Sequence, residues 1–224
     1  MENLTVKKNE LIRNGCDSSN IYLTAVDLLY EEQINVAMAE AIAEAGQIDI
    51  LVNGVGGSSV RCSLVEADVA EFEKIVKLNL TAGCFLPAKL FAAYWIRNSI
   101  CGVILNIASM ASYNPLSGGW AYSGAKAAVM NQTMAQAAEL ADYGIRVNAL
   151  APGFFLGKQN KHLLLNNDGT PTERGMKVLA HTPFNRFGKP DELCAPAIFL
   201  CSGGASFVSG ITMPVDGAYL CSNI

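Results

Sequence analysis

The sequence is poor in the residues that bind metals and nucleic acids. Its 224 residues include only two histidines, His162 and His181, and no run of lysine or arginine longer than Lys7-Lys8. The formal net charge is -4 at pH 7, whereas nucleic-acid and anionic-membrane surfaces need clustered positive charge. We therefore expect no metal site, no nucleic-acid partner and no membrane-binding surface.

The sequence also lacks long apolar runs and paired cysteines. No uninterrupted apolar stretch is long enough to cross a bilayer, and the polar start does not resemble a signal peptide. The seven cysteines are scattered and never spaced as Cys-x-x-Cys, which favours free thiols in a reducing compartment. With 51% hydrophobic and 16% charged residues, residues 1-224 are expected to form a single cytoplasmic domain.

Short apolar segments recur along the chain, with helical segments between them. Strands are predicted near 21-26, 48-53, 103-107, 145-150 and 211-215, and helices around 5-14, 31-46, 68-97, 120-141 and 190-201. This alternation is typical of a parallel sheet with crossover helices on both faces. The predicted fold class is α/β, a doubly wound parallel sheet of about five strands.

Polar and turn-forming residues follow four of the predicted strands. They are Asn53-Gly54-Val55-Gly56, Ala108-Ser109, Pro152-Gly153 and Asp216-Gly217. In open parallel sheets the ligand lies at the carboxyl ends of the strands. We therefore expect a binding site where these segments meet.

Tyr122 and Lys126 lie one turn apart on the predicted helix 120-141. The i,i+4 spacing brings their side chains together. A neighbouring ammonium favours the phenolate form of tyrosine, whose ordinary pKa is about 10. The pair therefore indicates proton transfer to or from a carbonyl.

Together these segments resemble the short-chain dehydrogenase/reductase family. The matches run in the family's order over most of the chain: Asn53-Gly-Val-Gly56 for its Asn-Asn-Ala-Gly turn, Asn79, Ser109, Tyr122 with Lys126, and Pro152-Gly153. The resemblance implies a Rossmann-like fold. It also implies NAD or NADP as cofactor, and hydride transfer between nicotinamide and a small-molecule carbonyl or secondary alcohol.

The resemblance assigns roles to individual residues. Tyr122 would be the general acid or base, and Ser109 would hold the substrate oxygen. Lys126 would bind the nicotinamide ribose and lower the pKa of Tyr122, and Asn79 would anchor a water of a proton relay. The implied cofactor-binding residues are Asp27, Asn53, Gly54, Val55, Gly56, Tyr122, Lys126, Pro152 and Gly153. For Asp27, a solvated turn is an equally good interpretation.

The start of the chain departs from the family pattern. Complete members open with a strand, a glycine-rich turn and a helix, whereas residues 1-12 resemble the later part of the helix that follows their second strand. The predicted strand 21-26 would then match their third strand. We expect an N-terminally truncated fold whose first βαβ unit is missing, by nature or through a shortened gene model.

The pyrophosphate cradle of complete members has no counterpart at this start. Gly54-Val-Gly56 could be mistaken for it, but Ser59 stands in place of the third glycine. We therefore expect weakened dinucleotide binding, and the residue that would choose between NAD and NADP is missing. Strands 21-26 and 48-53 would pair directly or leave an open edge.

The substrate is suggested by a softer resemblance. Phe154 to Asn160 and Thr182 to Gly188 look most like the branch of the family that acts on sugar acids, such as fructuronate or mannonate oxidoreductases and gluconate-type dehydrogenases. The irregular stretch between Phe154 and Arg186 is predicted to be a lid or substrate loop. Its candidate partners for a carboxylate are Lys158, Lys161, His162 and Arg174, whereas Arg186 could simply position the loop.

Other functions remain open from the sequence. The chain could be a non-catalytic scaffold or subunit with impaired dinucleotide binding. Epimerase or dehydratase chemistry ranks lowest, because such enzymes generally carry a larger C-terminal substrate region.

From Ala121 to Ala141 only Lys126 and Glu139 are charged, so this helix is expected to be covered on two sides. A homodimer or homotetramer would supply the second cover.

Overall fold

A computed structural model describes residues 2-58, 60-157 and 160-222, and places a parallel sheet between layers of helices. The strands are β1 (Ile50–Asn53), β2 (Val103–Ile107), β3 (Arg146–Pro152) and β4 (Thr212–Val215). The helices that precede β2 in the chain are α1 (Glu2–Arg13), α2 (Glu31–Ala45), α3 (Val69–Val76) and α4 (Leu86–Asn98). Those that follow are α5 (Trp120–Leu140), α6 (Lys161–Leu164), α7 (Glu173–His181) and α8 (Cys194–Cys201).

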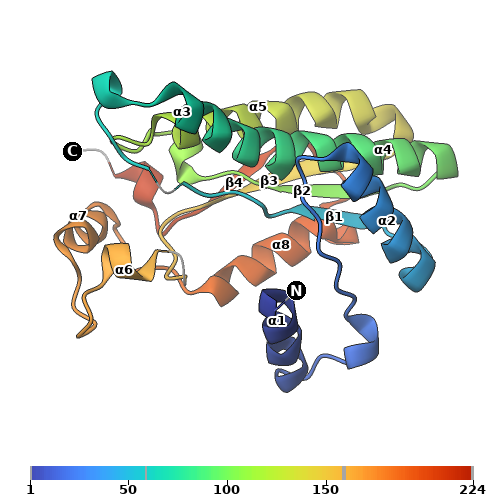
Figure 1. Cartoon of the computed structure of the whole chain (residues 1–224), viewed down its shortest axis with the longest axis horizontal. Coiled ribbons are helices and arrows are strands. Elements are labelled where there is room, and N and C mark those ends of the chain that lie inside the picture. The colour runs from blue at the N-terminus through green and yellow to red at the C-terminus, as the bar shows by residue number, and fades with distance from the viewer. Residues whose placement is uncertain (1, 59, 158–159, 223–224) are drawn as a thin grey trace.

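The sheet has the order β1-β2-β3-β4, and every neighbouring pair is parallel. Figure 1 shows α3, α4 and α5 on one face and α8 on the other. Parallel strands need helical crossovers that cover both faces. The predicted doubly wound α/β architecture is therefore confirmed.

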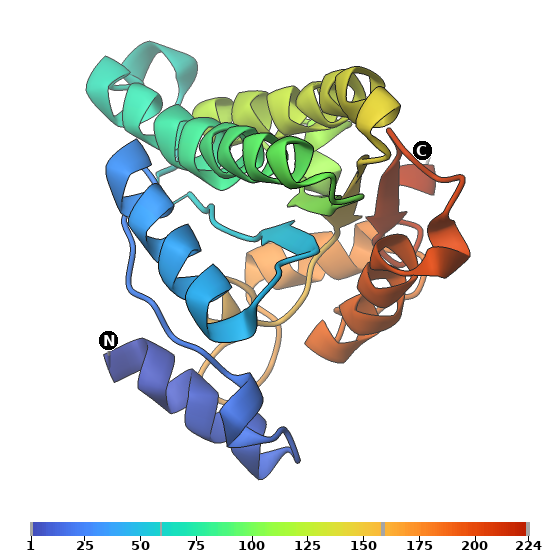
Figure 2. The ribbon, with the colours of Figure 1, turned by 90° about the vertical axis from the view of Figure 1, so that its right-hand side faces the viewer.

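The prediction of a strand at 21-26 is wrong, and the described chain has four strands rather than about five. Residues 21-27 form a connection outside the sheet, where the Ile21 carbonyl accepts a hydrogen bond from Lys8 at 2.7 Å. An extended segment becomes a strand only when a neighbour supplies its backbone hydrogen bonds. The direct pairing with 48-53 does not form, so β1 is an edge strand. Figure 2 shows α2 beside this edge.

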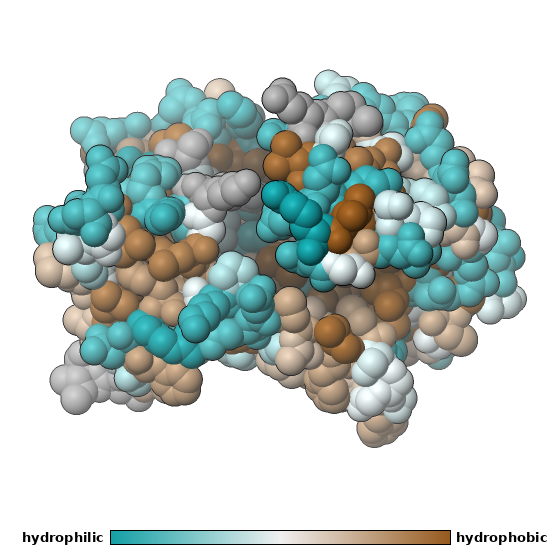
Figure 3. All heavy atoms as spheres, turned by 90° about the horizontal axis from the view of Figure 1, so that it is seen from below, coloured by the Kyte–Doolittle hydropathy of each residue, from teal (hydrophilic) through white to brown (hydrophobic). Residues whose placement is uncertain are grey.

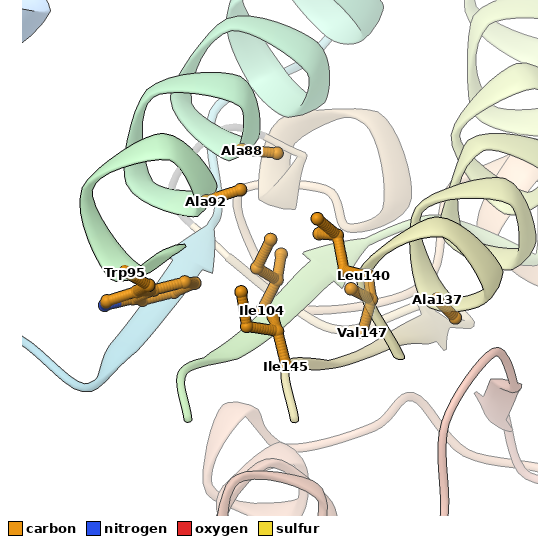
Figure 4. Packing of buried hydrophobic residues seen from close by; sticks show 8 residues of the cluster. All are labelled: Ala88, Ala92, Trp95, Ile104, Ala137, Leu140, Ile145 and Val147. Atoms are coloured by element: carbon orange, nitrogen blue, oxygen red, sulfur yellow. The ribbon is translucent and has the colours of Figure 1, made fainter. Parts of the chain in front are cut away.

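The buried side chains of β2 and β3 alternate between the two faces of the sheet. Ile104 and Val147 point toward α4 and α5, whereas Leu105 and Leu150 pack against Leu200 of α8. Figure 4 shows the first cluster, which consists of Ala88, Ala92, Trp95, Ile104, Ala137, Leu140, Ile145 and Val147. Period-two alternation with both faces buried explains the continuous apolar runs of these strands.

The helix predicted over 68-97 is a continuous helical run, Val69–Asn98, but its middle is a π-helical segment, Lys77–Phe85. A Cβ at Gly83 would lie 2.3 Å from the Val55 carbonyl oxygen, so only glycine fits this close approach. By length and composition this run could span a membrane, yet half of its most apolar window is buried in the fold. A buried core helix passes the same test, so the finding is weak evidence for a membrane span.

The segment between Phe154 and Arg186 is more regular than predicted, because it contains α6 and α7. Thr172 caps α7 by accepting a hydrogen bond from the Gly175 amide at 3.0 Å, and a Cβ at Gly175 would lie 2.1 Å from the Leu164 carbonyl oxygen. A Thr N-cap followed by Glu173 was a usable helix signal. We call this segment the lid, and Figure 1 shows it beyond one end of the sheet.

The face that carries α8 is covered only in part. Ile50 and Val52 of β1 are 44% and 55% exposed, and Ile198 of α8 is 67% exposed. Figure 3, which views the molecule from below, shows apolar residues on both sides of a central hollow. Apolar side chains thus remain exposed beside the open edge of the sheet.

Candidate active site

Ser109 and Tyr122 meet at the carboxyl end of β2. Ser109 follows this strand and is 6% exposed, and its hydroxyl accepts a hydrogen bond from the Ala111 amide at 3.1 Å. Tyr122 lies in the first turn of α5, and its phenol shares a hydrogen bond with the Ser109 side chain. The two hydroxyl groups therefore converge on one position where a substrate oxygen could bind.

Lys126 lies one turn further along α5 and is only 3% exposed. Its ammonium donates a hydrogen bond to the Ile107 carbonyl at 2.6 Å, and lies 5.9 Å from the centre of the Tyr122 ring. An ammonium carries three donors. Two of them remain for groups on the open side of the site.

The electrostatics of this pair differ from the sequence expectation. Burial raises the pKa of Tyr122 above its ordinary value of 10, and the hydrogen bond to Ser109 opposes this only partly. Burial lowers the pKa of Lys126 to about 8, with a small opposing effect from Cys84. Desolvation is the largest cause of the Tyr122 shift, and Lys126 is not among its causes, so the expected lowering of the Tyr122 pKa by Lys126 is not found in this structure.

Asn79 lies in the π-helical segment and is completely buried. Its side-chain oxygen accepts a hydrogen bond from the Gly57 amide at 2.9 Å, and its amide group donates to the carbonyls of Gly57 at 2.7 Å and Ile75 at 2.9 Å. Both amide hydrogens are thus used by the protein. Asn79 fixes the loop after β1 against the helix, and its part in a proton relay stays a prediction.

Asn53 does not direct its side chain into the site. It is 4% exposed and donates to the Asn106 side-chain oxygen at 2.9 Å, and Asn106 in turn donates to the Thr133 hydroxyl at 3.0 Å. This buried chain of hydrogen bonds links β1, β2 and α5. The side chain of Asn53 is therefore structural.

The glycines of the same turn offer open backbone. A Cβ at Gly54 or Gly57 would meet nothing within 4 Å, whereas one at Gly56 would lie 3.1 Å from the Lys126 ammonium. Val55 is 38% exposed and packs its carbonyl against the helix. Gly56 is thus brought next to Lys126, and its part in cofactor binding stays a prediction.

Pro152 and Gly153 end β3 next to the end of β4. The Gly153 amide donates to the Val215 carbonyl at 2.9 Å, and a Cβ at Gly153 would lie 2.7 Å from the Asp216 Cα. A cleft of about 110 Å³ opens beside them. It is lined by Phe154, Phe155, Thr182, Phe184, Arg186 and others that include Asp216.

Asp27 behaves as a turn residue. Its carboxylate accepts a hydrogen bond from the Leu29 amide at 3.0 Å, and its own amide donates to the Gln33 side chain at 3.0 Å. Its neighbours Val26 and Leu28 line a mostly apolar cleft of about 250 Å³ that β1 also borders. The hydrogen bonds support the turn interpretation, and the cleft leaves the adenine contact a prediction.

The lid residues are divided between the site and the surface. His162 of α6 lines a cleft of about 520 Å³ together with Gly57 and Lys74. Lys161 is exposed, and Lys158 and Ser59 lie outside the described residues. Arg186 donates to both carboxylate oxygens of Glu192, at 2.8 and 2.6 Å, which supports its role in positioning the loop.

Two loops beside Tyr122 make a contact that was not predicted from the sequence. Arg61 donates to the Ser117 carbonyl at 3.2 Å, and Trp120 donates to the Cys62 carbonyl at 3.1 Å. These bonds hold the loop after β1 against the loop that enters α5. The sequence feature that could have indicated this contact is an arginine in a glycine- and serine-rich loop after a strand.

In the described residues, no group of three His, Cys, Asp or Glu side chains could hold a metal ion.

The comparisons with known proteins agree with this geometry. Residues 4–219 match the family model described as enoyl-(acyl carrier protein) reductase. The chain is 38% identical over 211 residues to the uncharacterised oxidoreductase UxuB of Bacillus subtilis, a match that covers 88% of this chain and 75% of that relative.

Two solved structures show the same fold. One, a proposed D-mannonate oxidoreductase from Haemophilus influenzae with bound NAD, is 32% identical with a TM-score of 0.83, and the match covers 96% of this chain and 81% of that one. The other, a gluconate 5-dehydrogenase from Burkholderia cenocepacia in complex with NADP and tartrate, is 34% identical with a TM-score of 0.79, and the match covers 88% and 74%. With its parallel sheet, its Ser109–Tyr122–Lys126 arrangement and these matches, the chain belongs to the short-chain dehydrogenase/reductase family of oxidoreductases.

Proposed function

We propose that the chain interconverts a carbonyl and a secondary alcohol of a sugar acid, with NAD or NADP as the hydride carrier and Tyr122 as the general acid and base. The observation that supports this most directly is the hydrogen bond between Tyr122 and Ser109 beside the buried ammonium of Lys126. Relatives named for mannonate and gluconate support the substrate class.

The residues around Lys126 fit a nicotinamide nucleoside. Two ammonium donors of Lys126 remain for ribose hydroxyls, and the open backbone at Gly54 and Gly57 lets a planar or sugar group approach closely. When bound, the nicotinamide supplies or accepts the hydride, which no side chain can carry.

Tyr122 is suited to proton donation. Its raised pKa keeps the phenol protonated at neutral pH, so it can donate to a carbonyl oxygen as that oxygen gains negative charge. The Ser109 hydroxyl holds the same oxygen. The neighbouring Lys126 cation then stabilises the phenolate that remains. In alcohol oxidation the same groups act in reverse.

The test is turnover by Tyr122→Phe, with Tyr143→Phe as its control because Tyr143 is 50% exposed at the far end of α5. Oxidation of D-gluconate and D-mannonate is followed by the absorbance of the reduced nicotinamide. We expect Tyr122→Phe to lose about a hundredfold to ten-thousandfold in kcat and Tyr143→Phe to match the wild type. Equal turnover by Tyr122→Phe and the wild type would refute the role of Tyr122.

A second candidate is a family member that keeps the fold without turnover. The observation in its favour is the open edge at β1, where Ile50 and Val52 are exposed and the described residues add no further strand for the adenosine half of the cofactor to lie on. Calorimetric titration with NADH and NADPH separates the two candidates. A dissociation constant below about 100 μM, which corresponds to a binding free energy of roughly 5.5 kcal/mol, supports the oxidoreductase function. No binding by a folded protein supports the non-catalytic scaffold.

The outer face of α5 supports a homodimer or homotetramer. Its exposed residues include Asn131, Met134, Ala135 and Ala138, and Glu139 is the charged residue among them. A helix face with so little charge favours a protein cover. We infer that a second copy of the chain covers this face, and light scattering on the purified chain tests this inference.

The seven unpaired cysteines support a reducing, cytoplasmic location.

A further inference from the structure

The three side chains of the candidate site come from two separate elements. Ser109 follows β2 and precedes a short 3₁₀ turn, Met110–Ser112, whereas Tyr122 and Lys126 belong to α5. Proton transfer needs its donor and acceptor aligned within hydrogen-bonding distance. The placement of the 3₁₀ turn against α5 therefore decides whether the three side chains can act together.

Two hydrogen bonds tie Lys126 to the chain on either side of Ser109. Its ammonium donates to the Ile107 carbonyl at 2.6 Å, and its backbone carbonyl accepts a hydrogen bond from the Ser112 hydroxyl at 2.7 Å. Ile107 and Ser112 flank Ser109 in the sequence. The two bonds thus close a ring of covalent and hydrogen bonds that contains both Ser109 and Lys126 and joins the turn to α5.

The bond from Ser112 is an addition to the hydrogen bonds of the helix. Lys126 lies in the interior of α5, which runs from Trp120 to Leu140. Within a regular α-helix its carbonyl already accepts the amide of the residue four positions on, and a carbonyl has a second lone pair for another donor. Ser112 therefore caps no helix end, and the effect of its bond is to fix one element against another.

The surroundings of this bond are closed to water. Ser112 is 7% exposed, and Ala111 and Ala125, the residues that precede Ser112 and Lys126 in the sequence, are each 2% exposed. Burial of small apolar side chains is not directional, so it leaves α5 free to shift slightly against the turn. A hydrogen bond has a preferred length and angle. The Ser112 bond therefore limits movements that packing alone would permit.

The same turn sets the orientation of Ser109. The Ser112 amide donates to the Ser109 carbonyl at 2.9 Å, and the Ala111 amide donates to the Ser109 hydroxyl at 3.1 Å. The hydroxyl that would hold the substrate oxygen is thus fixed within the turn, and Ser112 fixes the turn to Lys126.

We propose that Ser112 is a positioning residue, which sets the distance between Ser109 and the Tyr122–Lys126 pair through its hydrogen bond to the Lys126 backbone. This inference rests on the proposed function, because it names a residue that aligns the groups of that reaction. Ser112 is buried and bonds to the backbone of α5, so the loss of its hydroxyl should lower kcat and leave KM nearly unchanged.

The test is Ser112→Ala, which removes the hydroxyl and little volume. With whichever of D-gluconate and D-mannonate the wild type oxidises, we expect kcat to fall about tenfold, because a small displacement of the reacting groups already slows the reaction. KM should stay within about twofold of the wild type. Ser112→Cys keeps a weak donor, and its kcat should lie between those of Ser112→Ala and the wild type.

Ser209→Ala is the matched control. The Ser209 hydroxyl also makes a hydrogen bond with the backbone, because it accepts one from the Val147 amide at 3.1 Å. Val147 lies at the amino end of β3, whereas the candidate site lies at the carboxyl ends of the strands. Ser209→Ala should therefore keep the kcat of the wild type.

A second readout needs neither substrate nor cofactor. Ionisation of the Tyr122 phenol is followed by difference ultraviolet titration of each protein against the same protein with Tyr122→Phe. Water admitted by a loosened α5 would lower the pKa of Tyr122 toward its ordinary value of 10, because burial is what raises it. We expect this decrease in Ser112→Ala and not in Ser209→Ala, whereas a merely structural loss of stability would leave the titration unchanged.

An unchanged kcat or an unchanged Tyr122 titration in Ser112→Ala would overturn the proposal, and so would equal effects in Ser209→Ala. If Ser112→Ala does not fold, the same two measurements on Ser112→Cys decide. If the wild type turns over no sugar acid, the proposed function fails. The Tyr122 titration then decides by itself, since a lower pKa in Ser112→Ala supports the positioning role and an equal pKa refutes it.

Discussion

Replacing Lys126 with methionine removes a buried ammonium and keeps an unbranched side chain of similar length. The ammonium is 3% exposed and donates to the Ile107 carbonyl at 2.6 Å. Burial lowers its pKa from 10.5 to about 8. At about 1.4 kcal/mol for each pKa unit, this lowering means that keeping Lys126 charged costs the folded state about 3 kcal/mol at neutral pH.

The pH dependence of stability follows from this difference. An unfolded lysine keeps its proton up to about pH 10.5, whereas the folded Lys126 releases it near pH 8. The unfolded state therefore binds more protons in this interval, and the stability of the wild type rises with pH across it. Relative to Lys126→Met, the wild type should gain about 2 to 3 kcal/mol between pH 7 and pH 10.

Urea denaturation of both proteins at several pH values measures the difference in unfolding free energy. Subtracting the two curves cancels the titration of tyrosines and cysteines that both proteins share. Lys177→Met is the control, because Lys177 is 75% exposed and its removal should leave the difference nearly constant with pH. A constant difference for Lys126→Met as well would refute the assignment of a buried, partly deprotonated lysine.

Three further predictions concern the frame of the site. Gly83→Ala should destabilise the fold by about 1 to 3 kcal/mol, because the new Cβ would lie 2.3 Å from the Val55 carbonyl oxygen; in urea denaturation, Gly124→Ala, whose Cβ would meet nothing within 4 Å, should instead be neutral or stabilising. Asn106→Leu should cost about 1 to 3 kcal/mol by leaving its buried hydrogen-bond partners unsatisfied, and thermal unfolding at wild-type stability would contradict the buried chain of hydrogen bonds. In a difference ultraviolet titration of wild type against Tyr122→Phe, the Tyr122 phenol should ionise above pH 10, and ionisation near neutral pH would show that Lys126 outweighs burial.

Local patterns determined most of the fold. The strand at 103-107 and the helix from 120 were predictable because strand and helix periodicities are properties of consecutive residues. The closeness of Tyr122 and Lys126 followed from the same local geometry, since residues at i and i+4 share a helix face. The order in which polar residues follow the predicted strands was enough to indicate the family.

Other features depended on neighbours that are distant in the sequence. The apolar segment 21-26 has the composition of a strand, but it has no strand beside it to complete its hydrogen bonds. Asn53 was expected in a turn, yet it is the last residue of β1, and its amide points inward because Asn106 offers a buried partner.

The electrostatics of the site were equally a matter of tertiary structure. The sequence by itself determined that Tyr122 and Lys126 are adjacent, and this adjacency indicated acid–base chemistry as the hypothesis to test. It could not determine the direction of their pKa shifts, nor that Arg61 donates a hydrogen bond to the carbonyl of the distant Ser117. Desolvation and charge pairing depend on what surrounds a group in three dimensions, and only folding brings those surroundings together.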